Sequence, residues 1–298
     1  MTLIEELEKA SQGFDGILGV SIKNLDTGEE AGLNSGTLFP AASVFKVPVL
    51  IELFRQVDAG ELDLEESVIL RSGDRVPGSG VLKEMSEGLK ITVKDLARLM
   101  MTVSDNTATD LIIKLVGKDR VNETISDLGL EETVVMTGCR EILFDLVGLD
   151  DLPDEEKTIE RFMEAAGVGE MDGTWSLGVE ENNVTTPEEM MMLLKMIVRG
   201  EAASREGCDM ILDIMSRCQT GRYRLAKYLP SQEISLIHKT GSLPGIRNDV
   251  GVVTVKDYGE RYIISCFTKE ASDVYEAEEV IALTSEHVYN YLNMRNKQ

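Results

Sequence analysis

Two residues near the start of the chain combine a nucleophile with a cation. Ser43-Val44-Phe45-Lys46 is the only Ser-x-x-Lys of the sequence. If a helix begins near Ala41 or Ala42, residues three apart lie on one face, so the Lys46 amine can reach the Ser43 hydroxyl. A lysine whose pKa is lowered by desolvation can take the serine proton. Alone, however, the motif more often means an N-capping serine followed by a solvated lysine.

Two further motifs carry polar groups of the same kind. Ser104-Asp105-Asn106 lies between an apolar helical pattern that ends at Val103 and another that begins at Thr107. Lys239-Thr240-Gly241 directly follows the predicted strand 234–238. Each could be an ordinary turn if it stood alone. Pro48, inside the helix predicted after Ser43, breaks a local rule of helix formation, and such departures tend to gather near functional sites.

The elements that must position these motifs follow from hydrophobic spacing. A strand at 17–22, a turn at 26–28 and a partner strand at 29–33 predict a hairpin. Residues from Phe39 to about Arg199 are mostly helical in pattern, most clearly at 47–57, 93–103, 107–116 and 187–198. Strand patterns return at 235–238, 249–255 and 262–267, and a closing helix is predicted at 274–294.

These elements predict an α/β (α+β) fold, with an antiparallel sheet flanked by helices and an all-α subdomain. We expect residues 1–36 and 226–298 to form the sheet subdomain and residues 37–225 to form the all-α subdomain, with a cleft between the two. The stretch at about 139–183 mixes acidic runs, a helical piece at 158–166 and a Gly-rich segment. It predicts a helical excursion with a long loop over the cleft.

Composition excludes several classes of function. The chain of 298 residues has 30 Lys and Arg against 53 Asp and Glu, a formal net charge of −23. This charge opposes binding to nucleic acid or to an anionic membrane. No apolar run is long enough to cross a bilayer, and the first residues lack a signal-peptide pattern. We therefore expect a cytoplasmic monomer; the alternative is a secreted or periplasmic protein whose signal peptide has been removed.

Cysteine and histidine usage argues against metals and disulfides. The four cysteines, Cys139, Cys208, Cys218 and Cys266, show no Cys-x-x-Cys pairing and are expected to be free thiols. Only His238 and His287 are present, and neither has zinc-ligand spacing. We expect neither a metal nor any other cofactor. No Gly-x-Ser-x-Gly elbow is present, which argues against an α/β-hydrolase triad.

In combination and in this order, the three motifs resemble those of class A β-lactamases and penicillin-binding proteins. The resemblance to the class A β-lactamase family of serine hydrolases extends over nearly the whole chain. Further matching stretches are Leu25-Asp26-Thr27-Gly28, Asp58-Ala59-Gly60-Glu61-Leu62, Thr92-Val93-Lys94-Asp95-Leu96, Thr185-Thr186-Pro187, Gly221 with Arg224-Leu225, and Asn248-Asp249-Val250.

The resemblance implies a role for each residue of the first two motifs. Ser43 is the nucleophile that is acylated, and Lys46 is its proton partner. Ser104 passes a proton to the leaving nitrogen. Asn106 hydrogen-bonds both Lys46 and the substrate amide.

The resemblance also implies how a substrate is held. Lys239 and Thr240 bind the substrate carboxylate, with Gly241 completing their motif, and they offset the repulsion of anions by the acidic surface. The backbone N–H groups of Ser43 and Ser242 form the oxyanion hole. Arg247 lies near the position of a carboxylate-binding arginine, although it could equally be a solvated loop residue. The expected partner is a small molecule with a carboxylate, either a β-lactam or a D-alanyl peptide.

The sequence departs from the family where the deacylating base should lie. In class A β-lactamases a Glu on a loop before the Thr-Pro element activates the water that releases the acyl group. Here that stretch is about thirty residues longer than usual, and the Glu-x-x-x-Asn pattern is not clear. Counting back from Pro187 selects Glu170, with Thr174 in place of the expected Asn. Glu164 and Glu180 are rivals.

The function that the resemblance implies is hydrolysis of the β-lactam amide bond through an acyl-enzyme. One alternative retains the acylation apparatus but acts on D-alanyl peptides or small esters. A second alternative is a β-lactam-binding sensor that is acylated slowly and stays acylated. The ambiguity at the deacylating base leaves all three open.

Overall fold

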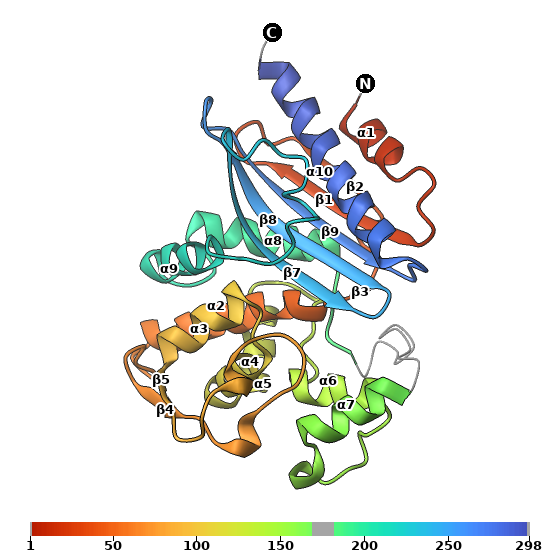
Figure 1. Ribbon diagram of the computed structural model, residues 1–298. Coiled ribbons are helices and arrows are strands. Elements are labelled where there is room, and N and C mark those ends of the chain that lie inside the picture. The colour runs from red at the N-terminus through yellow and green to blue at the C-terminus, as the bar shows by residue number, and fades with distance from the viewer. Residues whose placement is uncertain (1, 169–181, 297–298) are drawn as a thin grey trace.

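The computed structural model describes residues 2–168 and 182–296. Its largest sheet has five antiparallel strands in the order β2-β1-β9-β8-β7 (Figure 1). The strands are β1 (Ile17–Asn24), β2 (Glu30–Leu33), β7 (Ile234–Leu243), β8 (Ile246–Val255) and β9 (Arg261–Lys269). Both ends of the chain thus build one sheet, which confirms the predicted fold class.

The two faces of the sheet pack against different helices. Helices α1 (Leu3–Ala10) and α10 (Val274–Asn296) cover one face, and α8 (Pro187–Arg199) covers the other (Figure 1). Alternation along β8 sorts the side chains: Val253 packs with the α1–α10 cluster, whereas Val252 packs with the helical layer. The second face therefore shares one continuous core with the helices that carry two of the three motifs.

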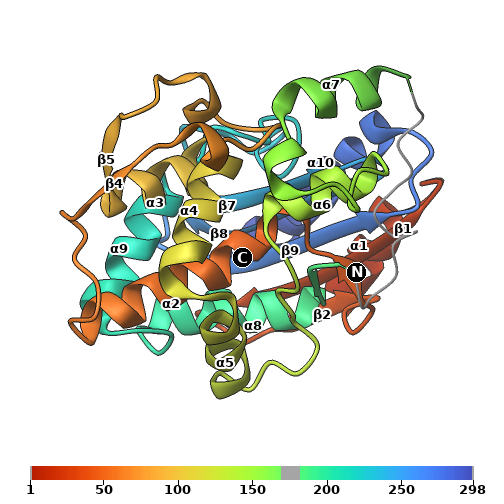
Figure 2. The ribbon, with the colours of Figure 1, turned by 90° about the horizontal axis from the view of Figure 1, so that it is seen from below.

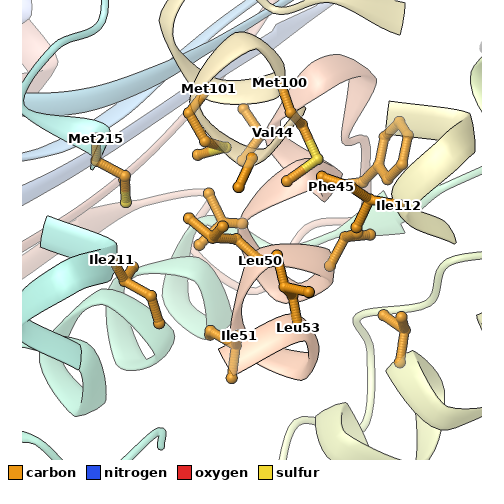
Figure 3. Close-up of a cluster of buried hydrophobic side chains, with 14 of the residues drawn as sticks. Val44, Phe45, Leu50, Ile51, Leu53, Met100, Met101, Ile112, Ile211 and Met215 are labelled. Atoms are coloured by element: carbon orange, nitrogen blue, oxygen red, sulfur yellow. The ribbon is translucent and has the colours of Figure 1, made fainter. Parts of the chain in front are cut away.

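The helical layer is built around α2 (Lys46–Asp58), of which ten residues are buried. Leu50 and Leu53 lie among Met100, Met101 and Ile112 (Figure 3). The view from below shows other helices of this layer around α2 (Figure 2). The other helices of this layer are α3 (Val93–Thr102), α4 (Asn106–Val116), α5 (Lys118–Asp127), α6 (Cys139–Leu146), α7 (Ile159–Val168) and α9 (Arg205–Met215).

Short elements complete the layer. The two-residue strands β3 (Phe39–Pro40) and β6 (Val184–Thr185) pair with each other, and so do β4 (Ser67–Ile69) and β5 (Lys90–Thr92). Four 3₁₀ turns are η1 (Ala42–Phe45), η2 (Ser72–Asp74), η3 (Leu82–Glu84) and η4 (Asp154–Glu156). Among the helices of residues 2–168 and 182–296, none has the length and apolar character that a membrane crossing requires.

One local expectation is corrected. Pro48 does not break a helix rule, because α2 begins at Lys46 and Pro48 falls in the first turn, where a missing N–H costs no hydrogen bond. The stretch at about 139–183, expected to be a helical excursion with a long loop, begins with helix α6, whose first N–H groups are capped by Asp110 of α4. The helical piece expected at 158–166 is α7.

Candidate active site

Ser43 lies in η1, immediately before α2. Its neighbours Ala42, Val44 and Phe45 are buried, whereas Ser43 is partly exposed. Ala42 has a φ of 44°, a left-handed conformation that costs a non-glycine residue on the order of 1–3 kcal/mol. The turn is anchored by the β3–β6 pair and by the Ala41 N–H, which donates to the Asn183 carbonyl at 2.7 Å. Packing thus holds a strained turn that leaves Ser43 accessible.

Ser43 opens into a cavity of about 250 Å³. Lining residues come from both layers and include Ser43, Asn106, Cys139, Leu143, Phe162 and Ser242. A larger cavity of about 580 Å³ lies between α4 and α6, but none of the residues of the three motifs lines it. Of these two cavities, the smaller one is therefore the one that adjoins Ser43.

Lys46 is fully buried beneath this cavity. Its Nζ donates to the Ser104 carbonyl at 2.9 Å, to Ser104 Oγ at 3.1 Å and to Asn106 Oδ1 at 2.9 Å. These bonds join the first motif to the second. Burial lowers the pKa of Lys46, although nearby Cys139, Asp110 and Asp105 oppose that shift. The lowered pKa makes the neutral, proton-accepting amine easier to form.

The third motif meets the other two at Ser104. The buried Lys239 Nζ donates to Ser104 Oγ at 3.0 Å and to the Thr240 carbonyl at 2.7 Å. Burial, together with repulsion from Lys46, lowers the pKa of Lys239 to about 7. With both lone pairs of Ser104 Oγ engaged by lysines, its O–H is left to donate elsewhere. Ser104 itself has a φ of 56°, a second left-handed residue in the site.

A close approach of backbones places the end of β7 against the Ser43 turn. A side chain at Gly241 would lie 2.8 Å from the Ala41 carbonyl oxygen and 3.2 Å from the Ser43 nitrogen. Glycine therefore lets Ser242 come beside Ser43, and both residues line the cavity. This is the arrangement expected if the two N–H groups are to share one oxyanion.

The contacts of Arg247 are with the β7–β8 hairpin and with Glu278 of α10. Its Nη1 donates to the carbonyls of Leu243 at 3.0 Å and Ile246 at 2.7 Å, and its Nε lies 3.5 Å from Glu278. Arg247 does not line the cavity that contains Ser43, as far as the described residues define it. Its observed contacts hold the β7–β8 hairpin.

Sequence reasoning gave no role to Arg224, which is buried behind the hairpin. Its guanidinium donates to the Gly241 carbonyl at 2.9 Å, to the Asn248 carbonyl at 2.8 Å and to Ser242 Oγ at 2.6 Å. It also pairs with Glu278. Arg224 therefore fixes the strand end that carries Gly241 and Ser242.

The side chains of Asn106 and Asp105, both in the second motif, also hold the backbone around them. Asn106 Nδ2 donates to the Pro77 carbonyl at 2.9 Å, which orients the amide so that its oxygen faces Lys46. Asp105 caps α4 through the Ala108 N–H and also accepts from the N–H groups of Val81 and Leu82. The motif thus ties the loop at 77–82 to the helix that carries it.

Sequence reasoning also gave no role to Cys139, the first residue of the stretch in which a deacylating carboxylate was expected. Its thiol is buried, lines the Ser43 cavity and interacts with Lys46. Burial raises the pKa of Cys139 to about 12, so the thiol is neutral at physiological pH. Asp110, whose pKa burial raises to about 6, accepts from the Cys139 N–H at 2.7 Å and fixes its position. The only sequence signal was that Cys139 begins the atypical stretch.

The carboxylates predicted for deacylation have different outcomes. Glu170 and Glu180, with Thr174, lie outside the described residues. Glu164 lies on α7 and is exposed to solvent. The role of any of them as a deacylating base stays a prediction.

Comparison with known proteins agrees with this geometry. Residues 2–292 match the β-lactamase enzyme family. β-Lactamase VEB-1 of Pseudomonas aeruginosa is 24% identical over 96% of this chain and 89% of its own length. A β-lactamase crystal structure from Sphaerobacter thermophilus is 30% identical, with a TM-score of 0.79 over 98% of this chain and 97% of that one.

A third similar structure holds a covalent intermediate. It is a mutant of PBP-A, with one leucine replaced by glutamate, solved as its acyl-enzyme complex with penicillin G. It is 27% identical, with a TM-score of 0.78 over 98% of this chain and 96% of that one. The family match over nearly the whole sequence and the shared fold lead to one conclusion: the chain belongs to the β-lactamase enzyme family and is a serine hydrolase.

Proposed function

We propose that this enzyme opens the β-lactam amide bond by transferring the acyl group to Ser43. The observation that carries the proposal is the convergence of Lys46 and Lys239 on Ser104 Oγ, beside the cavity into which Ser43 opens. The Ser43 oxygen forms a bond to the carbonyl carbon while its proton passes to the neutral Lys46 amine. The N–H groups of Ser43 and Ser242 stabilise the oxyanion.

Collapse of the tetrahedral intermediate breaks the C–N bond, and the leaving nitrogen needs a proton. Ser104 is placed to give its own proton and to recover one from Lys46 through their 3.1 Å contact. Water then hydrolyses the ester, which frees Ser43 and completes the β-lactamase cycle. PBP-A forms a covalent complex with penicillin G on the same fold, which supports the acylation step.

The substrate class follows from charge. A protein with a formal net charge of −23 repels anions, so an anionic substrate requires local cations. Lys239 is such a cation, and we assign the substrate carboxylate to Lys239 and Thr240. Both β-lactams and D-alanyl peptides carry this group.

A second function is favoured by Cys139. A neutral thiol beside Lys46 cannot act as the carboxylate that activates the deacylating water. If no carboxylate of the chain takes that role, the enzyme would acylate and then release its product slowly, as a penicillin-binding peptidase or a β-lactam sensor does. Hydrolysis and slow release differ only in the second half of the cycle.

The central test of acylation is covalent labelling. We expect a fluorescent penicillin to label one peptide, the one that contains Ser43, and Ser43→Ala to abolish labelling. Lys46→Ala should slow acylation by roughly 10²-fold, the usual scale for loss of a general base. Mass spectrometry locates the adduct, and stopped-flow fluorescence gives the rate. Labelling that survives Ser43→Ala unchanged would contradict the mechanism.

The pKa of Lys239 predicts how activity depends on pH. Below about pH 7 Lys239 is an ammonium, and above it the amine becomes neutral and loses its attraction for a carboxylate. The kcat/KM for nitrocefin should therefore fall as pH rises through about 7, and kcat/KM for neutral p-nitrophenyl acetate should fall less. Lys239→Arg, which keeps its charge, is the matched control and should flatten the nitrocefin profile. Parallel pH profiles of kcat/KM for both substrates would show that Lys239 does not bind the substrate carboxylate.

Replacement of Cys139 separates the two functions. Cys139→Glu should place a carboxylate beside Lys46 and speed deacylation on the order of 10²-fold, whereas Cys139→Gln, of similar size but without charge, should not. The rate is the decay of the acyl-enzyme in intact-protein mass spectra after excess penicillin is removed. If the wild type already deacylates rapidly and Cys139→Glu changes nothing, another group supplies the base and hydrolysis is the function.

A further inference from the structure

A second group of reactive side chains lies outside the catalytic cavity, on the segment between α9 and β7 and on the strands that it covers. His238 of β7 pairs in register with Gly251, and Thr240 pairs with Asp249 of β8. By strand alternation, His238 lies on the opposite face of β7 from Lys239. His238 Nδ1 and Asp249 Oδ1 are 2.8 Å apart, and both side chains are buried.

Cys218 approaches the His238 side of this pair from the covering segment. Its thiol interacts with the His238 imidazole, so the groups follow the order thiol, imidazole, carboxylate. This order activates a thiol when the carboxylate orients the imidazole and the imidazole takes or holds the proton. A side chain at Gly221 would meet Thr240 at 2.4 Å and Asp249 at 3.3 Å, so glycine allows the segment to lie this close to the sheet.

Accessibility separates Cys218 from the other thiols. Cys139, Cys208 and Cys266 are buried, with 6%, 0% and 0% of their surface exposed. Cys218 is partly exposed. Of the four cysteines, Cys218 is therefore the one whose residue reaches the surface.

The charges around Cys218 favour the thiolate. Burial alone would raise the pKa of Cys218, but the hydrogen bond and charge of His238 and the charge of Lys239 lower it to about 7. Burial likewise opposes the charged form of His238, but Asp249 and Cys218 outweigh it and raise the pKa of His238 to about 10. A thiolate–imidazolium pair therefore forms near neutral pH.

We propose that Cys218, with His238 and Asp249, is a site of thiol modification that small peroxides oxidise in preference to the other three cysteines. The thiolate sulfur attacks one oxygen of hydrogen peroxide, forming an S–O bond as the O–O bond breaks. The departing hydroxide takes a proton from the His238 imidazolium and leaves as water. The products are the Cys218 sulfenic acid and neutral His238, so the peroxide is reduced and the sulfur oxidised by two electrons.

Modification at Cys218 should reach the catalytic site through two hydroxyl groups. Cys218 Sγ lies 3.3 Å from Thr220 Oγ1, and Thr220 Oγ1 lies 2.6 Å from Thr240 Oγ1. An added oxygen on the sulfur competes for Thr220 and disturbs Thr240, the neighbour of Lys239 in the sequence. Oxidation is therefore expected to lower turnover of carboxylate-bearing substrates.

The test is labelling of the folded protein with hydrogen peroxide and dimedone, which captures sulfenic acid, followed by peptide mass spectrometry. The other three cysteines are internal controls, and we expect Cys218 to be labelled roughly tenfold faster or more at pH 7. The pH profile of alkylation by iodoacetamide, a neutral reagent, should have its midpoint near pH 7. His238→Gln should move this midpoint toward that of an ordinary thiol, about 8.5. Equal labelling of all four cysteines, or a wild-type midpoint at 8.5 or above, would overturn the proposal.

The expected effect of Cys218 oxidation on turnover is tested with a variant that lacks this thiol. Peroxide should slow nitrocefin turnover by the wild type, and Cys218→Ser should be insensitive to the same treatment whatever its starting rate. Equal inactivation of both proteins would overturn the link to Thr240. Because labelling and alkylation need no turnover, failure of the β-lactam assay would not be confused with failure of this site.

Discussion

Two buried lysines donate to one hydroxyl oxygen, and the rest of the site is arranged around that contact. Ser104 Oγ is 3.1 Å from Lys46 Nζ and 3.0 Å from Lys239 Nζ. Loss of hydration lowers the pKa of both buried lysines, and repulsion from Lys46 lowers the pKa of Lys239 further. The carbonyls of Ser104 and Thr240 and the amide of Asn106 compensate part of that cost. The proposed proton acceptor, proton relay and substrate-binding cation therefore lie within one group of contacts.

The fold holds this contact by packing three separate segments together. Helix α2 carries Lys46 in the centre of the helical layer, the start of α4 carries the second motif, and β7 brings Lys239 from the sheet. The approach is close enough that position 241 must lack a side chain and that Ala42 and Ser104 adopt left-handed backbones. Local strain is tolerated because the surrounding core fixes it, a pattern typical of active sites.

The sequence predicted what depends on motif and periodicity. Hydrophobic alternation located the strands of the sheet, and apolar helical spacing located α2, α3, α4 and α8 within one or two residues. The three motifs were enough to assemble Ser43, Lys46, Ser104 and Lys239 as candidates. Pro48 was misread because the change from a 3₁₀ turn to an α-helix at Lys46 has no signal in residue spacing. Arg224 was named only within a stretch that matches the family, and Cys139 only as a free thiol. Their contacts with the β7–β8 hairpin and with Lys46 are long-range, and no local pattern records them.

The central claim is that Lys46, Ser104 and Lys239 act as one unit through a shared oxygen. The direct measurement is a double-mutant cycle on the acylation rate, with Ser104→Ala, Lys239→Ala and the double variant followed by stopped-flow fluorescence with a fluorescent penicillin. Residues that share a contact are expected to be non-additive. The account predicts that the double variant acylates little more slowly than the slower single variant. Losses that multiply, with free energies additive to within about 0.5 kcal/mol, would contradict it.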